Sequence, residues 1–448
     1  MLSSEPNFGA IWGISAKISK PVRSNLIVEL MTGTSLYPRL RLYTKLQHYW
    51  RVAGEIASGK WRRGDSVNEL EETIAARIAT RHAIMVPMAR VGIYLTVKHL
   101  IKPGQNVILS PYTIADVVNM VICAGGKPVF ADIERETCNI DPAEIERLID
   151  DETGLVLVTH LYGLACNIRK IKTICDRKGV PLVEDAAQAF SVKVGGKDVG
   201  SFGRAGVYSF GLYKNVVSFY GGLVITDDDD LAARIRKEME PWPQIKMLLF
   251  LKKVFEAAVT DAVTWPTFFR AVTFKIFRYG TLHDVAAIND RLKIDVSPSR
   301  ISDFPRSYKW LPCALQARLV LSQIDEVDAH TKRRIGLAHR YHDALKGLNQ
   351  LYLPPVVTEG EHMYWYYPVQ FDDREDLVKY AMAHGRDITM SYHRNCADLE
   401  CFKDNARDCP NARKTANSLI YLPSYPSYPE SEVDENVAVL CRYFQRGC

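Results

Sequence analysis

Residues 182–188 read Leu-Val-Glu-Asp-Ala-Ala-Gln, an apolar run that ends in two carboxylates followed by small residues. The run is typical of a buried strand, and Asp185 would then lie at its carboxyl end, where open α/β sheets bind their ligands. A carboxylate in that place pairs with a cationic atom of a ligand. The alternative is that Asp185 caps a following helix.

Apolar strands alternate with amphipathic helices on both sides of this run. Strands are predicted over 106–109, 128–130, 154–159, 180–184, 207–210 and 223–226, with helices over 115–123 and 168–177. Fully apolar strands joined by helices are typical of a mainly parallel sheet that is covered on both faces. We therefore predict an α/β fold.

The pattern divides the chain into four parts. An N-terminal arm, a large sheet domain, an aromatic and basic insert, and a smaller C-terminal α+β domain are predicted over 1–50, 51–240, 241–300 and 301–448. The last part is predicted to contain a long helix over 316–342 and a strand over 362–370.

The composition excludes several classes of protein. The 448 residues carry 57 Lys and Arg against 52 Asp and Glu, a net charge of +5, and 47% are hydrophobic. These are ordinary globular values, so a disordered chain, a collagen-like repeat and a small disulfide scaffold are excluded. The positive excess is too small and too mixed in sign to indicate a nucleic-acid partner.

The cysteine spacing and the hydropathy of the chain indicate the cellular compartment in which we expect the protein. Cys396, Cys401 and Cys409 are the closest group of cysteines, and their spacing is not that of a zinc site, so we expect no metal and free thiols in a reducing cytosol. The first ten residues contain no apolar core of a secretory signal. The most apolar stretch, 247–274, is interrupted by charges and does not read as a membrane span, so we expect a cytoplasmic protein.

A second chemical feature surrounds Lys214. This lysine follows a predicted strand in the sequence Tyr-Ser-Phe-Gly-Leu-Tyr-Lys-Asn over 208–215, and a glycine pair follows at 221–222. Poor solvation in aromatic and apolar surroundings favours the free amine, which can form a Schiff base. In the alternative reading, Lys214 lies at the surface with its stem along aromatic rings.

Taken together, the surroundings of Asp185 and of Lys214 indicate a binding site for one ligand. Asp185 precedes Lys214 by 29 residues (214 − 185), and Ser209 precedes it by five (214 − 209). A helix predicted to begin near Arg90 offers backbone amides, which bind phosphate at helix N-termini. An amine, a carboxylate and a phosphate cradle are the groups that pyridoxal 5′-phosphate requires.

On these residues the chain resembles the DegT/StrS sugar aminotransferases, which are fold-type I pyridoxal phosphate enzymes. The resemblance covers about 55–235 and 305–445. Its carriers are the segments 128–133 (Pro-Val-Phe-Ala-Asp-Ile), 160–163 (His-Leu-Tyr-Gly), 183–189 (Val-Glu-Asp-Ala-Ala-Gln-Ala), 209–210 (Ser-Phe) with Lys214, 221–222 (Gly-Gly), 315–317 (Leu-Gln-Ala) and 422–423 (Leu-Pro).

The resemblance implies a role for each matching residue. Lys214 resembles the Schiff-base lysine, and Asp185 resembles the partner of the pyridine nitrogen. Gln188 resembles the side chain near the phenolic oxygen of the cofactor, and Ser209 resembles a phosphate ligand. The dehydratase branch of the family carries histidine in place of the lysine, so Lys214 favours amino transfer.

The chain departs from the family pattern in three places. Met88-Ala89 stands where the family has a Gly-Thr pair before the phosphate-binding helix. The amides of Ala89 and Arg90 could still bind the phosphate, and the Arg90 side chain could add charge. The alternative for Arg90 is an exposed helical arginine. Where an aromatic residue often stacks on the cofactor, Ile114 stands, and Tyr112 either stacks instead or packs in the core. Where the family has an Asn-x-Arg-like stretch that reaches across the dimer interface to the phosphate, this chain has Tyr308-Lys309-Trp310, in which Lys309 would act as a point charge.

The insert has no counterpart in the family pattern. Residues 246–279 mix aromatic and aliphatic side chains with lysines and arginines. Aromatic, basic helices can lie in a membrane interface, which would give a peripheral membrane contact through 246–279. The alternative is that the insert packs on the sheet domain or across a dimer.

We therefore expect a homodimeric aminotransferase of amino-sugar or polysaccharide biosynthesis that holds pyridoxal phosphate on Lys214. The resemblance implies a ping-pong Schiff-base mechanism with L-glutamate as donor and a nucleotide-linked keto-sugar as acceptor. Two alternatives remain: a non-sugar or lipid-linked carbonyl substrate, and a catalytically weakened member that acts in regulation or as a scaffold.

Overall fold

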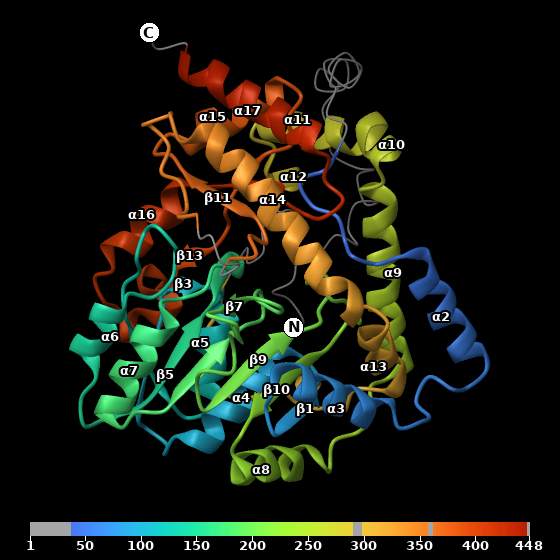
Figure 1. Cartoon of the computed structure of the whole chain (residues 1–448), viewed down its shortest axis with the longest axis vertical. Coiled ribbons are helices and arrows are strands. Elements are labelled where there is room, and N and C mark those ends of the chain that lie inside the picture. Colours follow the sequence, from blue (N-terminus) through green and yellow to red (C-terminus); the bar gives the residue numbers. More distant parts are fainter. Residues whose placement is uncertain (1–36, 290–297, 357–361, 446–448) are drawn as a thin grey trace.

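The computed structural model describes residues 37–289, 298–356 and 362–445 (Figure 1). Most of the expected arm, residues 1–36, and part of the insert, residues 290–297, lie outside the described residues. Figure 1 shows a large sheet with its helices in one half of the molecule and a smaller sheet with helices in the other.

The large sheet has seven strands in the order β1-β10-β9-β6-β5-β2-β4. The strands are β1 (His82–Val86), β10 (Gly222–Thr226), β9 (Ala205–Ser209), β6 (Leu182–Asp185), β5 (Thr153–Thr159), β2 (Asn106–Leu109) and β4 (Lys127–Phe130). The pairs from β9 to β4 are parallel, whereas β10 runs antiparallel to both β9 and β1. The predicted α/β class with a mainly parallel sheet is confirmed.

Both faces of this sheet are buried, which explains why its strands are apolar throughout. Along β2, Val107 and Leu109 belong to one core cluster and Ile108 to the other, as the alternation of side chains along a strand requires. The helices of this half are α3 (Ser66–Ile78), α4 (Ala89–Leu100), α5 (Ala115–Cys123), α6 (Pro142–Leu148), α7 (Ile168–Lys178) and α8 (Asp229–Met239).

The smaller sheet has the order β11-β14-β12 and is antiparallel. Its strands are β11 (Tyr367–Gln370), β14 (Leu419–Leu422) and β12 (Thr389–Met390), and its helices are α14 (Val327–Leu345), α15 (Arg374–Ala383), α16 (Pro410–Ser418) and α17 (Glu430–Phe444). The predicted strand over 362–370 is too long. Tyr364 has a left-handed backbone (φ 52°), which bends the chain before β11 begins.

The predicted helix over 316–342 is also wrong as a single element. It is divided into α13 (Ala314–Leu321), a 3₁₀ turn over Ile324–Glu326 and α14. The buried Gln323 lies at the break, where its side chain accepts from the amide of Val217 (3.1 Å) and donates to the carbonyl of Val217 (2.8 Å). These two contacts tie the break to the segment that follows Lys214, which hydrophobic periodicity does not predict.

The insert forms a run of helices. Its first, long helix lies along one flank of the molecule beside α2 (Leu46–Ala57), and its later helices lie near those of the C-terminal half (Figure 1). Its elements are α9 (Met247–Val263), α10 (Pro266–Phe268), a π-helical turn over Phe269–Thr273, α11 (Phe274–Leu282) and α12 (Ala286–Asn289). Asp261 of α9 accepts hydrogen bonds from Tyr49 of α2 (2.6 Å) and from Thr44. The insert therefore packs on its own chain along its inner side.

Candidate active site

A cavity of about 250 Å³ opens beside the carboxyl ends of the parallel strands. Asp185 and Ser209, the last residues of the neighbouring strands β6 and β9, line it together with Lys214. Of the other residues predicted from the sequence, Ala89, Arg90 and Gln188 line the cavity. Among the described residues, Tyr112 and Lys309 are not part of its lining.

Asp185 is buried, with 4% of its surface exposed. Its carboxylate accepts from the amide of Ala187 (3.0 Å) and lies 3.4 Å from the hydroxyl oxygen of Thr159. Burial raises the pKa of Asp185, and the Ala187 amide and the charge of Lys214 oppose that rise. No helix follows within 186–192, so the alternative of a helix cap is wrong, and Asp185 is a buried carboxylate that faces the cavity.

Lys214 is half-buried at the cavity, in the bend that follows β9, rather than on the outer surface. Its backbone amide donates to the carbonyl of Gly211 (3.1 Å). Its Nζ atom lies 4.6 Å from the centroid of the Trp365 ring, within the range of a cation–π contact. The amine is therefore held against an aromatic wall that comes from the other half of the chain.

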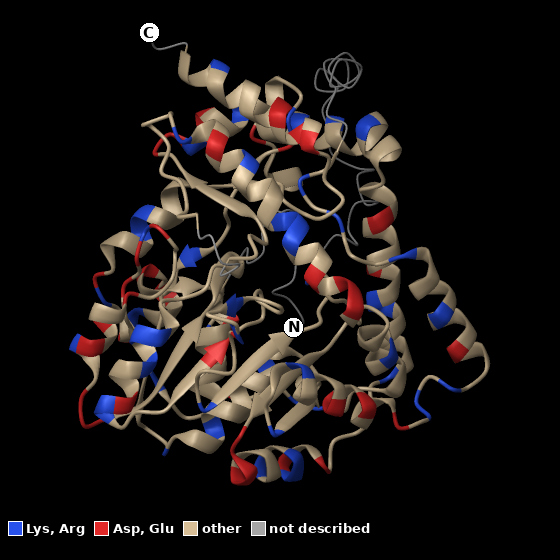
Figure 2. Cartoon of the chain, viewed as in Figure 1, with Lys and Arg blue, Asp and Glu red and all other residues tan. Residues whose placement is uncertain are grey.

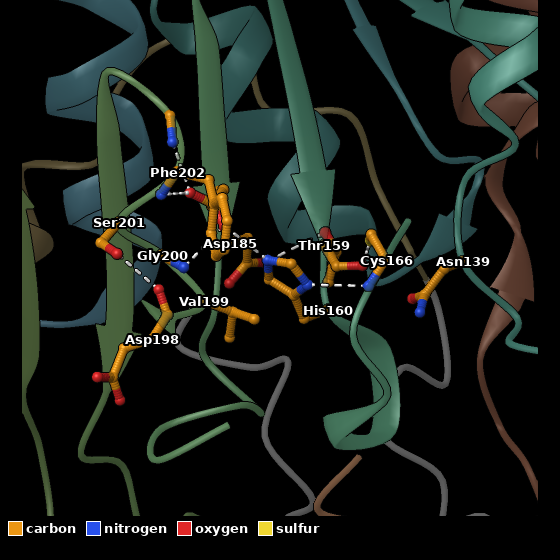
Figure 3. Close-up of polar contacts among 12 residues, drawn as sticks. Asn139, Thr159, His160, Cys166, Asp185, Asp198, Val199, Gly200, Ser201 and Phe202 are labelled. Atoms are coloured by element: carbon orange, nitrogen blue, oxygen red, sulfur yellow. Dashed lines mark hydrogen bonds and ion pairs between the residues drawn. The ribbon is translucent and has the colours of Figure 1, made fainter. Parts of the chain in front are cut away.

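A hydrogen-bond network behind Asp185 fixes the end of β6 (Figure 3). The carboxylate of Glu184 accepts from the amides of Gly200 (2.7 Å), Phe202 (2.6 Å) and Gly203 (2.7 Å), and it lies 3.0 Å from Nε2 of His160.

The tautomer of His160 follows from its two contacts. Nδ1 of His160 accepts from the amide of Cys166 (3.1 Å), so the ring proton is on Nε2 and is donated to Glu184. His160 is fully buried. Glu184 and His160 therefore act as positioning residues for the strand that carries Asp185.

Tyr162 holds the side chain of Gln188 through a backbone hydrogen bond. The amide of Tyr162 donates to Oε1 of Gln188 (2.7 Å), and Tyr162 has a left-handed backbone (φ 59°). Such a conformation is uncommon outside glycine and is concentrated at functional sites. The hydrogen bond fixes the orientation of the Gln188 amide at the cavity.

The start of α4 supplies the amide groups that were predicted to bind phosphate. Met88 at the N-cap makes no capping hydrogen bond through its side chain, and the first amides of a helix have no acceptor within the helix. A Cβ on Gly222 would lie 2.5 Å from the nitrogen of Ala89, so only glycine allows β10 to approach this helix end. Met88, Ala89 and Arg90 all border the cavity.

The Arg90 side chain is only 15% exposed, so the alternative of an exposed helical arginine is wrong. It forms an ion pair with Asp116 and lies 3.4 Å from the hydroxyl of Tyr308. Its charge is thus already compensated by a carboxylate.

Sequence reasoning missed the residues that the C-terminal half contributes. Trp365, Tyr366, His393 and Tyr421 line the cavity opposite the sheet. Burial and the charge of Lys214 lower the pKa of His393 to about 4, so this imidazole is neutral near pH 7. No spacing rule connects these positions to Lys214 or Asp185, because they reach the cavity only through the tertiary fold.

Tyr112 belongs to a buried cluster of hydroxyl groups beside these residues. Its oxygen lies 2.9 Å from that of Tyr162 and 3.1 Å from that of Ser391, and Ser391 lies 2.8 Å from the hydroxyl of Tyr421. The cluster joins β3 (Tyr112–Thr113) to the smaller sheet. Tyr112 thus packs in the core, the second of the two roles considered for it.

The insert also reaches the cavity. Thr260, Val263 and Thr264 at the end of α9, with Phe269 and Phe277 beyond it, are among the lining residues. One wall of the cavity is therefore largely apolar and is built by a segment outside the sheet domain.

The groups that line this cavity fit pyridoxal phosphate. A buried carboxylate suits a protonated ring nitrogen, a lysine amine suits an aldehyde, and the start of α4 beside Ser209 suits a phosphate. An uncompensated buried carboxylate is costly unless a cation joins it, which gives Asp185 a physical reason to take such a ligand.

Comparison with known proteins identifies the family of this chain. A model of the DegT/DnrJ/EryC1/StrS aminotransferase family matches residues 47–241 and 313–440, on either side of the insert. The spore coat polysaccharide biosynthesis protein SpsC of Bacillus subtilis (strain 168) is 30% identical over 397 residues, which are 86% of this chain and 91% of that protein.

Solved structures show the same fold. The sugar aminotransferase CalS13 from Micromonospora echinospora superposes with a TM-score of 0.70 at 20% identity, over 90% of this chain and 99% of that chain. DesI, solved in the presence of its TDP-sugar product, superposes with a TM-score of 0.68 at 23% identity, over 93% of this chain and 94% of that chain. The fold is that of fold-type I aminotransferases. The chain therefore belongs to the DegT/DnrJ/EryC1/StrS family and is an aminotransferase, in a family whose members generally depend on pyridoxal phosphate.

Proposed function

We propose that this aminotransferase transfers the amino group of L-glutamate to a nucleotide-linked keto-sugar, with pyridoxal phosphate held at the cavity. The observation that carries the proposal is that Lys214 and the buried carboxylate of Asp185 line one cavity at the carboxyl ends of neighbouring strands.

Each group of the cofactor has a partner in this proposal. Asp185 would pair with the pyridine nitrogen, Lys214 would condense with the aldehyde carbon with loss of water, and Gln188 would lie near the phenolic oxygen. The amides at the start of α4 and the Ser209 hydroxyl would bind the phosphate. When bound, the cofactor supplies a carbonyl that exchanges between amines and a ring that withdraws electrons from the reacting carbon.

The chain itself then moves protons. The Lys214 amine, displaced by the incoming amino donor, would take the proton from the α-carbon of that donor and deliver it to the cofactor carbon that bears the nitrogen. With the acceptor it would move a proton in the reverse direction, from that cofactor carbon to the acceptor carbon that receives nitrogen. Asp185 keeps the ring nitrogen protonated, and its burial strengthens that pairing because little water screens it.

The proposed acceptor rests on the relatives. SpsC is named for polysaccharide biosynthesis, and DesI was solved with a TDP-sugar product. We propose a homodimer in which Lys309, which is exposed and outside the cavity lining of its own chain, reaches the phosphate of the partner subunit's cofactor.

The test is a half-reaction in two steps. Cofactor-loaded enzyme is mixed with L-glutamate, and one 2-oxoglutarate per active site is expected; a nucleotide keto-sugar should then regenerate the starting absorbance. Lys214→Ala should abolish the reaction, and Asp185→Asn should slow it about a hundredfold or more. Lys237→Ala, at an exposed position of α8, is the matched control and should leave it unchanged.

Two results would contradict the proposal. Formation of 2-oxoglutarate by Lys214→Ala would remove the role of this lysine. No 2-oxoglutarate from the loaded wild-type enzyme would instead favour a regulatory or scaffolding homologue.

The apolar wall from the insert favours a second candidate acceptor, a lipid-linked or other amphiphilic carbonyl. Val263, Phe269 and Phe277 would border such a substrate. Enzyme that has taken up the amino group of glutamate distinguishes the two acceptors. Loss of that amino group to soluble nucleotide keto-sugars supports the first acceptor, and loss only to amphiphilic carbonyls supports the second.

A further inference from the structure

Among the described residues, the large apolar side chains that are exposed lie on one flank of the molecule. In the described segments, every large apolar side chain classed as exposed belongs either to α2 or to the stretch from α9 to the π-helical turn. They are Leu46, Trp50, Met247, Leu248, Leu251, Phe255, Trp265, Phe268 and Val272. We call this set the apolar flank. Scattered surface apolar residues need no explanation, but a patch confined to two neighbouring helical segments is typical of an interaction surface.

The outer side of α9 is almost free of charge. Its exposed positions are Met247, Leu248, Leu251, Lys252, Phe255, Ala258 and Ala262, of which only Lys252 is charged. Leu248 and Phe255 are 81% and 68% exposed and lie seven residues apart (255 − 248), which places them on one side of the helix. Figure 2 marks the charged residues of α9 on the ribbon.

The carboxylates of these helices are turned inward and already bonded. Glu55 of α2 accepts from Nε of Arg318 (2.9 Å), Glu256 is paired with Lys253 (3.1 Å), and Asp261 accepts from Tyr49 (2.6 Å). All three carboxylates belong to residues that are only partly exposed.

The exposed charges on this flank are basic. Arg51, Lys252 and Arg270 are exposed, as is Lys45, which is paired with Glu326 (2.7 Å). The flank thus combines aromatic and aliphatic side chains with cations. Within the described residues, α2, α9 and the π-helical turn carry no exposed carboxylate.

We infer that the apolar flank lies on the surface of an anionic lipid bilayer. Tryptophan, phenylalanine and leucine enter the boundary between headgroups and acyl chains, while lysine and arginine meet anionic headgroups. A second copy of this chain is a poorer occupant, because a two-fold contact would set this surface against itself, where its cations would meet no exposed carboxylate of α2, α9 or the π-helical turn. Across the described residues, no helix combines the length and hydropathy needed to cross the bilayer, so the contact is peripheral.

The contact would border the active site. The inner side of the same helices supplies Val263, Thr264 and Phe269 to the cavity, while Trp265 and Phe268 between them face outward. A few residues of the insert thus separate the proposed lipid surface from the cavity.

The experiment is co-sedimentation of the full-length chain with lipid vesicles. Vesicles of phosphatidylcholine alone and of phosphatidylcholine with phosphatidylglycerol are compared at low and high salt. The wild-type chain should sediment with the anionic vesicles, and less so at high salt, because exposed charge interactions are screened.

Two sets of variants test whether the apolar flank is the surface that binds lipid. Leu248→Ser with Phe255→Ser should reduce binding about tenfold or more, since affinity scales with buried apolar area. Phe255→Trp keeps the apolar character and should preserve binding. Lys252→Glu with Arg270→Glu should abolish the preference for anionic lipid, whereas Lys178→Glu with Lys237→Glu, the same change of charge at exposed sites of α7 and α8, should not.

The outcomes are distinct. A wild-type chain that stays in the supernatant with both vesicles overturns the inference. So does a Leu248→Ser, Phe255→Ser variant that shifts from dimer to monomer in size-exclusion chromatography without losing any vesicle binding, because the flank is then a contact between copies. The half-reaction with L-glutamate, measured on the same variants without lipid, tests the aminotransferase assignment separately.

Discussion

The Nζ atom of Lys214 lies 4.6 Å from the centroid of the Trp365 ring, so a residue of the sheet domain and one of the C-terminal half meet in the cavity. The backbone fixes this relationship. The amide of Trp365 donates to the carbonyl of Tyr162 (2.7 Å), and that of Met363 donates to Gly163 (2.7 Å). These two hydrogen bonds join the loop that carries Trp365 to the loop that carries Tyr162, whose amide is bonded to Gln188.

Removing the Trp365 ring should weaken amino transfer. A cation–π contact contributes about 0.5 to 2 kcal/mol, so Trp365→Ala should lower the rate of the glutamate half-reaction about tenfold. Trp365→Phe keeps an aromatic face and should retain most of the rate. Stopped-flow absorbance of the cofactor gives the rate for both variants. Equal rates in Trp365→Ala and wild type would show that the contact has no catalytic consequence.

Breaking the Glu184 network should cost stability. Glu184→Gln replaces an oxygen that accepts backbone amides with an NH₂ group that cannot, which should lower the free energy of unfolding by about 3 kcal/mol. Urea unfolding followed by circular dichroism measures the change. Glu240→Gln, at an exposed residue after α8, is the control and should change the free energy little. A Glu184→Gln variant as stable as that control would contradict the structural role of the network.

The neutral imidazole of His393 should make stability depend on pH. Its pKa is lowered from 6.5 to about 4 in the folded chain, so between these values the unfolded chain binds a proton that the folded chain does not. The free energy of unfolding from this residue therefore rises with pH across that window, by up to about 1.4 kcal/mol per pH unit.

The measurement is urea unfolding of wild type and His393→Asn at pH 7.5, 6 and 5. The wild type should lose more stability on acidification than the variant, because the asparagine does not titrate. Parallel pH profiles would mean that His393 keeps its ordinary pKa.

Gly222 should tolerate no side chain. A Cβ there would lie 2.5 Å from the Ala89 nitrogen and 2.6 Å from the Met88 carbonyl carbon, so Gly222→Ala must displace the start of α4. We expect a loss of about 1 to 3 kcal/mol in unfolding free energy and weaker retention of pyridoxal phosphate.

The control for Gly222 is Gly336→Ala in α14, where nothing lies within 4 Å of the added Cβ. That change should stabilise the helix by about 0.5 to 1 kcal/mol. Calorimetry measures the stability of the two variants, and equilibrium dialysis measures how well each retains the cofactor. Full cofactor retention by Gly222→Ala would contradict the proposed phosphate site.

The elements that were predicted well are those fixed by local periodicity. The helix over 115–123 and the strand over 106–109 match α5 and β2 at both ends. Each is an uninterrupted apolar run or a clear helical repeat next to a turn, so neighbours in the sequence determine it. Asp185 could be proposed because it ends such a strand, and Lys214 because it follows one.

The residues that were missed depend on contacts distant in the sequence. Trp365 follows the left-handed Tyr364, and its amide is bonded to the carbonyl of Tyr162, which is also left-handed; no local pattern signals those turns. His393 lies in the segment between β12 and β13 (Arg394–Asn395), far from both Lys214 and Asp185 in the sequence. The break at Gln323 has the same origin, since its partner is the backbone of Val217. Sequence periodicity therefore predicts the sheet and the strand-end groups, but not the wall that faces them.

The most direct test of the central claim is to trap the bond between the cofactor and the chain. The enzyme is loaded with pyridoxal phosphate, reduced with borohydride and digested, and the peptides are mapped by mass spectrometry. The account predicts that the cofactor is found on Lys214 and that Asp185→Asn weakens its retention. Labelling of a different lysine, or equal labelling of a Lys214→Ala variant, would contradict it.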